Sequence, residues 1–189
     1  MGRLAGLAGL KSGSPQSRIE ETSDPNAPTY YFYGQEELEA DLFGEDSSTH
    51  GARFIKTNDD VLTLQTGDLV FSLISGKATT VGRPHDGFLF TQNYVRITPP
   101  STIDANYLAY LLNEDSSTRH QLLAGRQGSK LLKSTVRQLS ELEISGLPSL
   151  EVQKTIGSLY RNQLKLESLK KQQAMLETKF VLARMKGAH

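Results

Sequence analysis

From residue 151 to about residue 185 the chain keeps one helical pattern without a proline, and this long helix limits the possible folds more than any other segment. Ser149 stands where a helix N-cap is expected, because its hydroxyl can accept a hydrogen bond from the first turn. A helix of this length spans roughly 50 Å at about 1.5 Å per residue. A single domain is too small to cover all of it, so we expect part of the helix to project.

The same segment repeats in heptads, which is typical of a helix that pairs with another helix. Most of the seam positions are apolar, and the polar Asn162 and Gln173 are interruptions of the kind that fix the register of a coiled coil. The a positions are Val152, Leu159, Leu166, Gln173 and Phe180, and the d positions are Thr155, Asn162, Leu169 and Leu176. We predict a spacer and dimerisation helix; the alternative is an amphipathic helix that lies along its own domain.

The remainder of the chain is typical of one globular domain. With 189 residues, 37% of them apolar and 22% charged, the chain has room for one ordinary domain and an appended element. We therefore expect a domain over residues 1–148 and the helix over residues 149–186. The absence of cysteine excludes disulfides and thiolate metal sites, and it agrees with a reducing cytoplasm. Apolar runs such as residues 69–74 are too short to cross a membrane, and residues 1–10 resemble a short helix more than a signal peptide.

Short strand patterns followed by helical patterns predict an α+β fold for this domain. The helices are expected at residues 35–42, 104–113, 116–123 and 134–139, with Asp104 as an N-cap. The strands are expected at residues 30–33, 61–64, 69–74, 87–90, 94–98 and 143–145. The turn residues Gln-Thr-Gly-Asp at 65–68 favour a hairpin between the second and third of these strands.

The charge of the chain is balanced but unevenly distributed. The formal net charge is zero, yet Arg53 and Lys56 are the only cations between Glu20 and Asp68, a segment rich in acids. Residues 116–137 contain five basic residues and no acid. This uneven distribution favours a negatively charged partner that binds the basic middle of the chain. Chance variation of surface charge remains an alternative.

No catalytic or metal-binding pattern is complete. Ser75-Gly-Lys-Ala-Thr-Thr80 lacks the first glycine of a phosphate-binding loop, and Ala78 stands where that loop needs Ser or Thr. The four histidines are scattered at no ligand spacing, and Glu177 and Lys179 belong to the helical pattern. We expect no metal, no cofactor and no enzymatic activity.

Several segments, in this order, resemble the specificity subunits of type I restriction-modification systems. Two of them are typical of strands in that family, Thr66-Gly-Asp-Leu-Val70 and Phe90-Thr-Gln-Asn-Tyr-Val95. A third, Asp104-Ala-Asn-Tyr-Leu-Ala-Tyr-Leu-Leu112, is similar to a helix of the family, and residues 125–142 are similar to the stretch that leads to its last strand. Ile144-Ser-Gly-Leu-Pro-Ser-Leu-Glu-Val-Gln153 resembles the entry into the spacer helix, with Gly146 where the family has proline.

The resemblance implies a subunit that reads DNA and has no catalysis of its own. Members of the family carry two target-recognition domains and two antiparallel spacer helices, whereas this sequence shows one of each. We therefore expect a half-subunit that dimerises, or pairs with a different half, to read a bipartite site in double-stranded DNA. Methyltransferase subunits, and a restriction subunit where one is present, are the expected partners.

The expected DNA contacts are basic and amide side chains in loops, because such groups match phosphates and base edges. One set lies in and near the loop that should follow the strand at residues 69–74. The other lies in residues 116–137, which we call the basic segment. They are Lys77, Thr79, Thr80, Arg83, His85 and Gln92, together with Arg126, Gln127, Lys130 and Lys133. Each of them could also be a solvated surface residue. A coiled-coil interaction module without DNA binding is the alternative function, and a nuclease is a third possibility that the missing catalytic residues disfavour.

Overall fold

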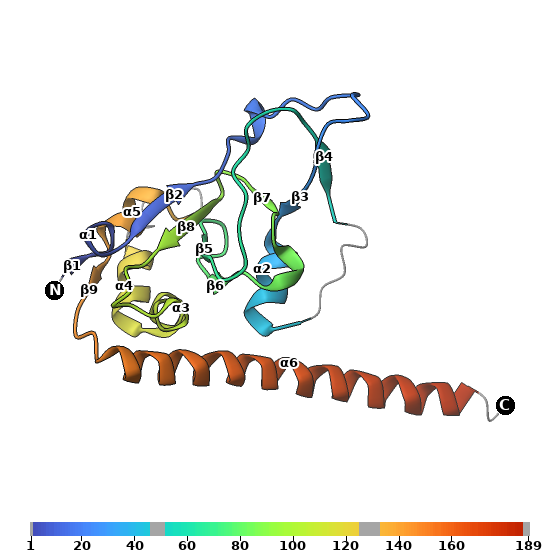
Figure 1. The fold of residues 1–189 in the computed structure, drawn as a ribbon. Coiled ribbons are helices and arrows are strands. Elements are labelled where there is room, and N and C mark those ends of the chain that lie inside the picture. The colour runs from blue at the N-terminus through green and yellow to red at the C-terminus, as the bar shows by residue number, and fades with distance from the viewer. Residues whose placement is uncertain (1, 46–51, 125–132, 187–189) are drawn as a thin grey trace.

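The computed structural model describes residues 2–45, 52–124 and 133–186. A domain of short strands and helices lies above one long helix, α6 (Leu150–Lys186), whose C-terminal end extends beyond the domain (Figure 1). Among the described residues, no helix is apolar over a length that could cross a membrane. The α+β class and the long C-terminal helix that the sequence predicts are both confirmed.

The largest sheet has four antiparallel strands in the order β2-β8-β5-β6. Its two central strands, β5 (Leu69–Ser72) and β8 (Tyr94–Thr98), pair Phe71 with Val95 and Leu69 with Ile97. The outer strands are β2 (Gly9–Ser12) and β6 (Ala78–Thr80). The apolar side chains of the central strands form the main core with α3 (Ala105–Glu114), because that helix lays Leu108 and Leu112 against the sheet.

A second sheet has three strands in the order β4-β3-β7. β3 (Thr29–Tyr33) pairs antiparallel with β4 (Phe54–Lys56) and parallel with β7 (Leu89–Phe90). Its inner side forms a smaller core that includes Tyr33 and Phe90 and is continued by Leu38 of α2 (Gln35–Phe43). A two-stranded ribbon, β1 (Gly2–Arg3) with β9 (Glu143–Ile144), joins the N-terminus to the segment before α6.

Several short helices surround these sheets, and most of them follow the sequence prediction. Asp104 caps α3 as expected, because its carboxylate accepts a hydrogen bond from the Tyr107 N–H at 2.9 Å. α4 (Ser116–Ala124) and α5 (Val136–Glu141) lie close to their expected positions. At the N-terminus the helix α1 covers only Leu4–Leu7, because strands β1 and β2 occupy the residues on either side.

The predicted hairpin of residues 61–64 with β5 is wrong. The first segment makes one isolated bridge, between Thr63 and Leu89, and β5 forms its hairpin with β6 instead. The Gln-Thr-Gly-Asp turn is present, with Gly67 at φ +90°, but the Gly67 N–H donates to the carbonyl of Val81. This bond directs the turn toward the end of β6, so the two flanking segments do not pair. β4 and β6 were not predicted as strands.

Gln153 ties the first turns of α6 to the segment before α3. Its side chain is 2% exposed, its Nε2 donates to the carbonyls of Thr102 and Pro148 at 3.3 and 2.9 Å, and its Oε1 accepts from the Asp104 N–H at 3.0 Å. One side-chain amide therefore satisfies three backbone groups. Gly157, one turn further along, lies so close to α3 that an added Cβ would stand 2.7 Å from the Tyr107 nitrogen.

Further contacts hold α6 along the domain. Tyr160 accepts a hydrogen bond from Asn113 at 3.0 Å and donates one to Glu114 at 3.2 Å, and burial raises its pKa to about 12. The hydroxyl of Ser168 donates to Glu45. The domain-facing side of the helix is thus occupied as far as Ser168.

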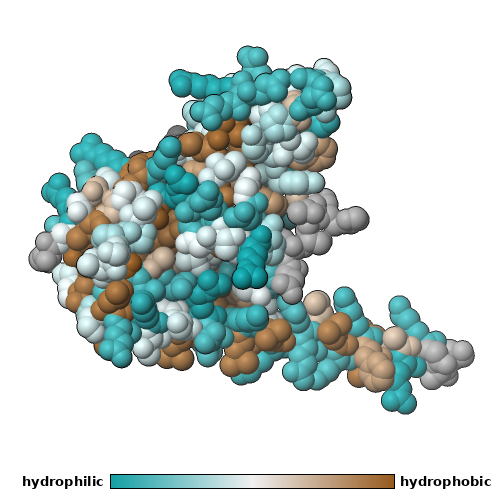
Figure 2. All heavy atoms as spheres, viewed as in Figure 1, coloured by the Kyte–Doolittle hydropathy of each residue, from teal (hydrophilic) through white to brown (hydrophobic). Residues whose placement is uncertain are grey.

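The predicted heptad seam lies on another side of α6 and is exposed. At about 3.6 residues per turn, the seam positions point away from the side that carries Gln153, Gly157 and Ser168. Leu159 is 68% exposed, Leu176 62% and Phe180 63%. Apolar side chains recur along α6 at the outer edge of the molecule (Figure 2). The domain therefore leaves the seam free.

We predict that Gly157→Ala lowers the free energy of unfolding by about 1–3 kcal/mol, because the new methyl group collides with the backbone of α3. The loss should occur although alanine favours an exposed helix by about 1 kcal/mol over glycine. Urea unfolding measures it. Ser158→Ala is the matched control, since Ser158 is exposed on the same turn, and it should be neutral or slightly stabilising.

Candidate nucleic-acid interface

The turn between β5 and β6, residues 73–77, is the centre of the candidate interface. Ser72 holds this turn, because its Oγ accepts hydrogen bonds from the N–H groups of Ile74 and Ser75, both at 3.2 Å. Its carbonyl accepts a further bond from the Gly76 N–H, at 2.8 Å. Gly76 has φ +69°, a conformation that a residue with a side chain rarely adopts.

Two other segments meet the β5–β6 turn at the same end of the sheet. The Leu73 N–H donates to the carbonyl of Asn93 in the turn between β7 and β8, at 2.8 Å. The Leu73 carbonyl accepts from the N–H of Ser134, also at 2.8 Å, which places the C-terminal end of the basic segment beside the turn. We call the surface formed by residues 74–77, Gln92, Asn93, Arg119 and Lys133 the turn face.

A small hollow lies on one side of the β5–β6 turn. It has a volume of about 80 Å³ and is bordered by the C-terminal end of α3 and by α4. Lys77 and Arg119 bring positive charge to it, and Lys77 also pairs with Glu114 at 3.5 Å. Its lining residues are Ser75, Gly76, Lys77, Leu112, Asn113, Arg119, Leu122 and Leu123.

A wider groove of about 500 Å³ lies on the other side of the turn. The Arg53 guanidinium stacks on the ring of Phe32 at 4.7 Å, and the amide oxygen of Gln16 can accept from it at 2.7 Å. Gln35 and Asn93 add further amides to the lining. Two carboxylates, Glu36 and Glu37, also line the groove. Amides and carboxylates can pair with base edges, whereas carboxylates repel phosphates, so the groove suits base edges more than the DNA backbone.

The structure gathers some of the predicted DNA contacts and separates others. Lys77, Gln92 and Lys133 lie on the turn face, and Gln92 and Lys133 are exposed there. Arg83 is exposed as well, but it follows β6 and so lies at the opposite end of that strand from Lys77. Arg126, Gln127 and Lys130 lie outside the described residues. The prediction that these residues contact DNA is not tested by the structure.

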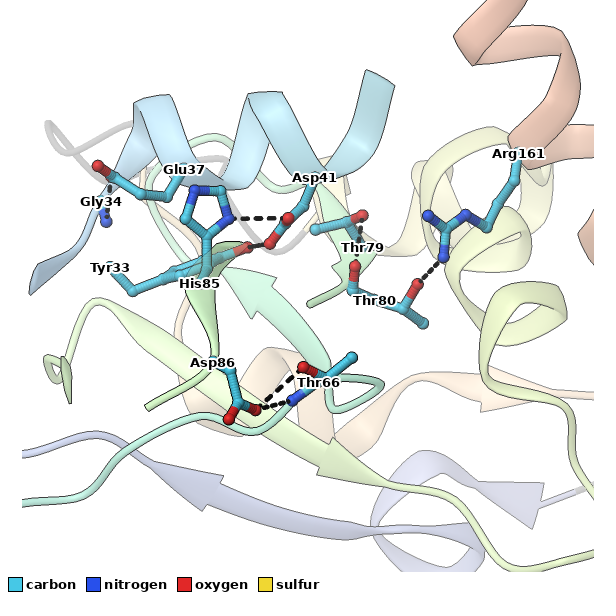
Figure 3. A network of polar contacts seen from close by, with 10 residues as sticks. All are labelled: Tyr33, Gly34, Glu37, Asp41, Thr66, Thr79, Thr80, His85, Asp86 and Arg161. Atoms are coloured by element: carbon cyan, nitrogen blue, oxygen red, sulfur yellow. Dashed lines mark hydrogen bonds and ion pairs between the residues drawn. The ribbon is translucent and has the colours of Figure 1, made fainter. Parts of the chain in front are cut away.

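Three of the predicted contacts are buried, because the expected loop is in fact strand β6 followed by a short turn of 3-10 helix. His85 is 1% exposed, and its Nδ1 lies 2.8 Å from Oδ1 of Asp41 (Figure 3). The hydroxyl of Tyr33 donates to the other oxygen of that carboxylate, at 2.9 Å. Burial, followed by the neighbouring Asp41 charge, raises the pKa of Tyr33, so its hydroxyl stays protonated as a donor.

Thr79 and Thr80 are buried between β6, α3 and α6. The Thr80 hydroxyl donates to Oδ1 of Asn106 at 3.0 Å and accepts from the Arg161 guanidinium of α6 (Figure 3). Thr79 donates to the carbonyl of Thr80 at 3.5 Å. We correct the expectation for His85, Thr79 and Thr80, because all three are buried. Thr80 helps to hold α6 on the domain, whereas His85 belongs to the buried network of Asp41 and Tyr33.

A nearby carboxylate stabilises the turn before β5. Asp86 accepts hydrogen bonds from the N–H and the hydroxyl of Thr66, at 2.7 and 3.0 Å (Figure 3). These bonds, the backbone one first, lower the pKa of Asp86. Among the described residues, no three histidine or acidic side chains gather in a way that could hold a metal ion.

Sequence reasoning missed Arg119, Arg53 and Ser75 of this interface. Arg119 belongs to the basic segment already noted, so charge alone could have included it. Ser75 lies two residues before Lys77, so its place in the same turn could have been predicted. Arg53 stands within the acidic segment, and no sequence signal places it in the groove beside this turn.

The globular domain and α6 together match solved structures of specificity subunits. A chain from a structure that describes the assembly and conformational transition of a type I restriction-modification system is 18% identical, with a TM-score of 0.60 over 97% of this chain and 42% of that one. The HsdS subunit of Thermoanaerobacter tengcongensis is 19% identical, with a TM-score of 0.59 over 97% and 41%. This chain has the fold of a type I specificity subunit.

A third similar structure is the type I restriction-modification S subunit of M. genitalium, at 15% identity and a TM-score of 0.50 over 84% of this chain and 37% of that one. The present chain spans about two fifths of the length of these subunits. No protein-family model matches the sequence, and no curated protein does either. The structural matches confirm the sequence resemblance at the level of the fold.

We predict that Asp41→Ala lowers the free energy of unfolding by about 3–5 kcal/mol, because it removes the acceptor shared by two buried side chains. The shift of the urea midpoint measures the loss. Asp60→Ala is the control, since Asp60 is exposed, and it should change the midpoint little. Equal midpoints for the two variants would show that the buried network does not stabilise the domain.

Proposed function

We propose that this chain is a DNA-recognition and scaffold subunit of a type I restriction-modification system, in which residues 1–148 read one half of a bipartite site. The likeness to specificity subunits over 97% of the chain carries the proposal, because it includes both the globular domain and the long helix. The subunit itself has no catalytic role. It acts in the cytoplasm with methyltransferase subunits, and with a restriction subunit where one exists.

The turn face is the part of the domain that we assign to DNA. It combines the cations Lys77, Arg119 and Lys133 with the amides of Gln92 and Asn93 at one end of the sheet. Cations position a protein on the phosphate backbone, and amides pair with base edges, with asparagine and glutamine suited to adenine. The strands behind these turns are buried and hydrogen-bonded, so the face is presented on a rigid support.

The helix α6 acts in this proposal as a spacer that pairs with a second spacer helix. The side that bears Gln153 and Gly157 is occupied by the domain, whereas the seam from Val152 to Phe180 is exposed. A second copy of the chain would pair across a two-fold axis and read a palindromic site, and a different half would read an asymmetric one. Since the helix is stiff, its length sets the distance between the two half-sites at about 3.4 Å per base pair.

We predict that the full chain binds duplex DNA with an affinity that falls steeply as salt rises, because several cations replace counterions on the backbone. Fluorescence anisotropy with a labelled duplex over roughly 50–200 mM salt measures this, and a loss on the order of 10³ is expected for about six phosphate contacts. A chain that binds no duplex, or binds with a flat salt response, would instead favour the coiled-coil module without DNA binding.

We predict that Leu176→Asp abolishes self-association or pairing with the second spacer helix, because it places a charge in an apolar seam. Leu176 is 62% exposed, so the domain itself should keep its stability. Analytical ultracentrifugation measures the association. Ala174→Asp introduces the same charge on another side of the helix and should pair normally. If both variants associate like the wild type, the seam is not the pairing surface.

A further inference from the structure

Ser75 holds the one polar side-chain atom that is buried without a partner in the described part of the chain. Its Oγ has no hydrogen-bond partner there, although it is shielded from solvent. A buried hydroxyl without a partner is unfavourable, so native proteins rarely keep one unless a ligand or water completes it. Ser75 lines the small hollow beside the β5–β6 turn.

The hollow is also bordered by the exposed guanidinium of Arg119, which no described residue neutralises. Within the described residues, Arg119 makes no side-chain hydrogen bond or ion pair, and Lys77 pairs with Glu114 over 3.5 Å between two half-exposed side chains. The two cations outnumber the single carboxylate, so the hollow keeps a net positive charge. Its walls include Leu112 and Leu122, and apolar walls strengthen the attraction for an anion.

We infer that this hollow seats one phosphate of the DNA backbone, with Arg119 as the main ligand, Lys77 as a second charge and the Ser75 hydroxyl as a donor. A phosphate oxygen would supply the acceptor that Ser75 lacks, once rotation about the Cα–Cβ bond turns the shielded hydroxyl toward the opening of the hollow. The planar guanidinium can donate two parallel hydrogen bonds to a phosphate, which a point charge cannot do. The inference rests on the proposed DNA binding and assigns one part of the turn face to the backbone.

The position of the hollow gives the contact a consequence for sequence reading. The β5–β6 turn separates it from the groove that holds Gln35 and Asn93, so a phosphate held at Arg119 would fix where the bases lie relative to those amides. A phosphate contact carries no sequence information directly, but it sets the register of the contacts that do. Arg119 is therefore a positioning residue for base reading.

The test measures the binding of the full chain to two duplexes, one with a site selected from a random library and one with that site scrambled. For Arg119→Ala, we expect equal losses on both duplexes and a decrease of about 0.9 in the magnitude of the salt slope, the value for one phosphate contact. Arg119→Lys should keep the slope but bind more weakly. Arg3→Ala removes the same charge from exposed strand β1, away from the hollow, and should leave the slope unchanged.

A second variant separates binding from folding. Ser75→Ala should weaken binding to both duplexes with an unchanged salt slope, and its urea midpoint should equal or exceed that of the wild type, since the hydroxyl has no partner in the free protein. Duplexes with one neutral methylphosphonate locate the contact. A neutral group at any contacted phosphate should weaken the wild type. At the phosphate that the hollow holds, the same group should cause no further loss for Arg119→Ala, because that variant already lacks this contact.

Three results would overturn the inference while leaving DNA binding intact. They are a salt slope of Arg119→Ala equal to that of Arg3→Ala, a loss confined to the selected site, and a Ser75→Ala variant that loses stability together with binding. A wild-type chain that binds neither duplex would overturn the proposed function, and the phosphate seat with it.

Discussion

The close contact between α6 and α3 determines how the rest of the molecule is arranged. Gln153 satisfies three backbone groups with one amide. Gly157 lets the two helices approach more closely than any residue with a side chain would allow. Because this contact occupies one side of α6, the opposite seam is left exposed and the end of the helix projects beyond the domain. The orientation of the globular domain relative to α6 therefore depends on a glycine and a glutamine.

Buried polar groups connect α6 to the strands behind the turn face. Asn113 bonds to both backbone groups of Ala78 on the edge of β6 and also to Tyr160 of α6. Thr80, in the same strand, accepts from Arg161. These bonds need specific partners at specific distances, so they favour one placement of α6 over others that would bury a similar apolar area. A rigid connection of this kind fits the proposed role of α6, which requires the domain to stay at a constant distance from a second one.

Local patterns predicted some elements well and others poorly. The long helix, the Asp104 cap and strands β3, β5 and β8 follow from periodicity and from cap chemistry, which are local properties. The hairpin partner of β5 was wrong, because the Gln-Thr-Gly-Asp turn bonds to Val81, a residue distant in sequence. For the same reason His85, which resembles a loop residue in sequence, lies buried against Asp41 and Tyr33.

The sequence by itself determined the helix, its heptad seam and the basic character of the middle of the chain, because each depends on the order of residue types alone. Only the tertiary structure decided which side of α6 the domain covers and which cations share a surface. Lys77, Arg119 and Lys133 meet because the β5–β6 turn bonds to Ser134 and packs against α4. Such contacts join residues far apart in the chain, and their free energy depends on packing geometry that no local pattern records.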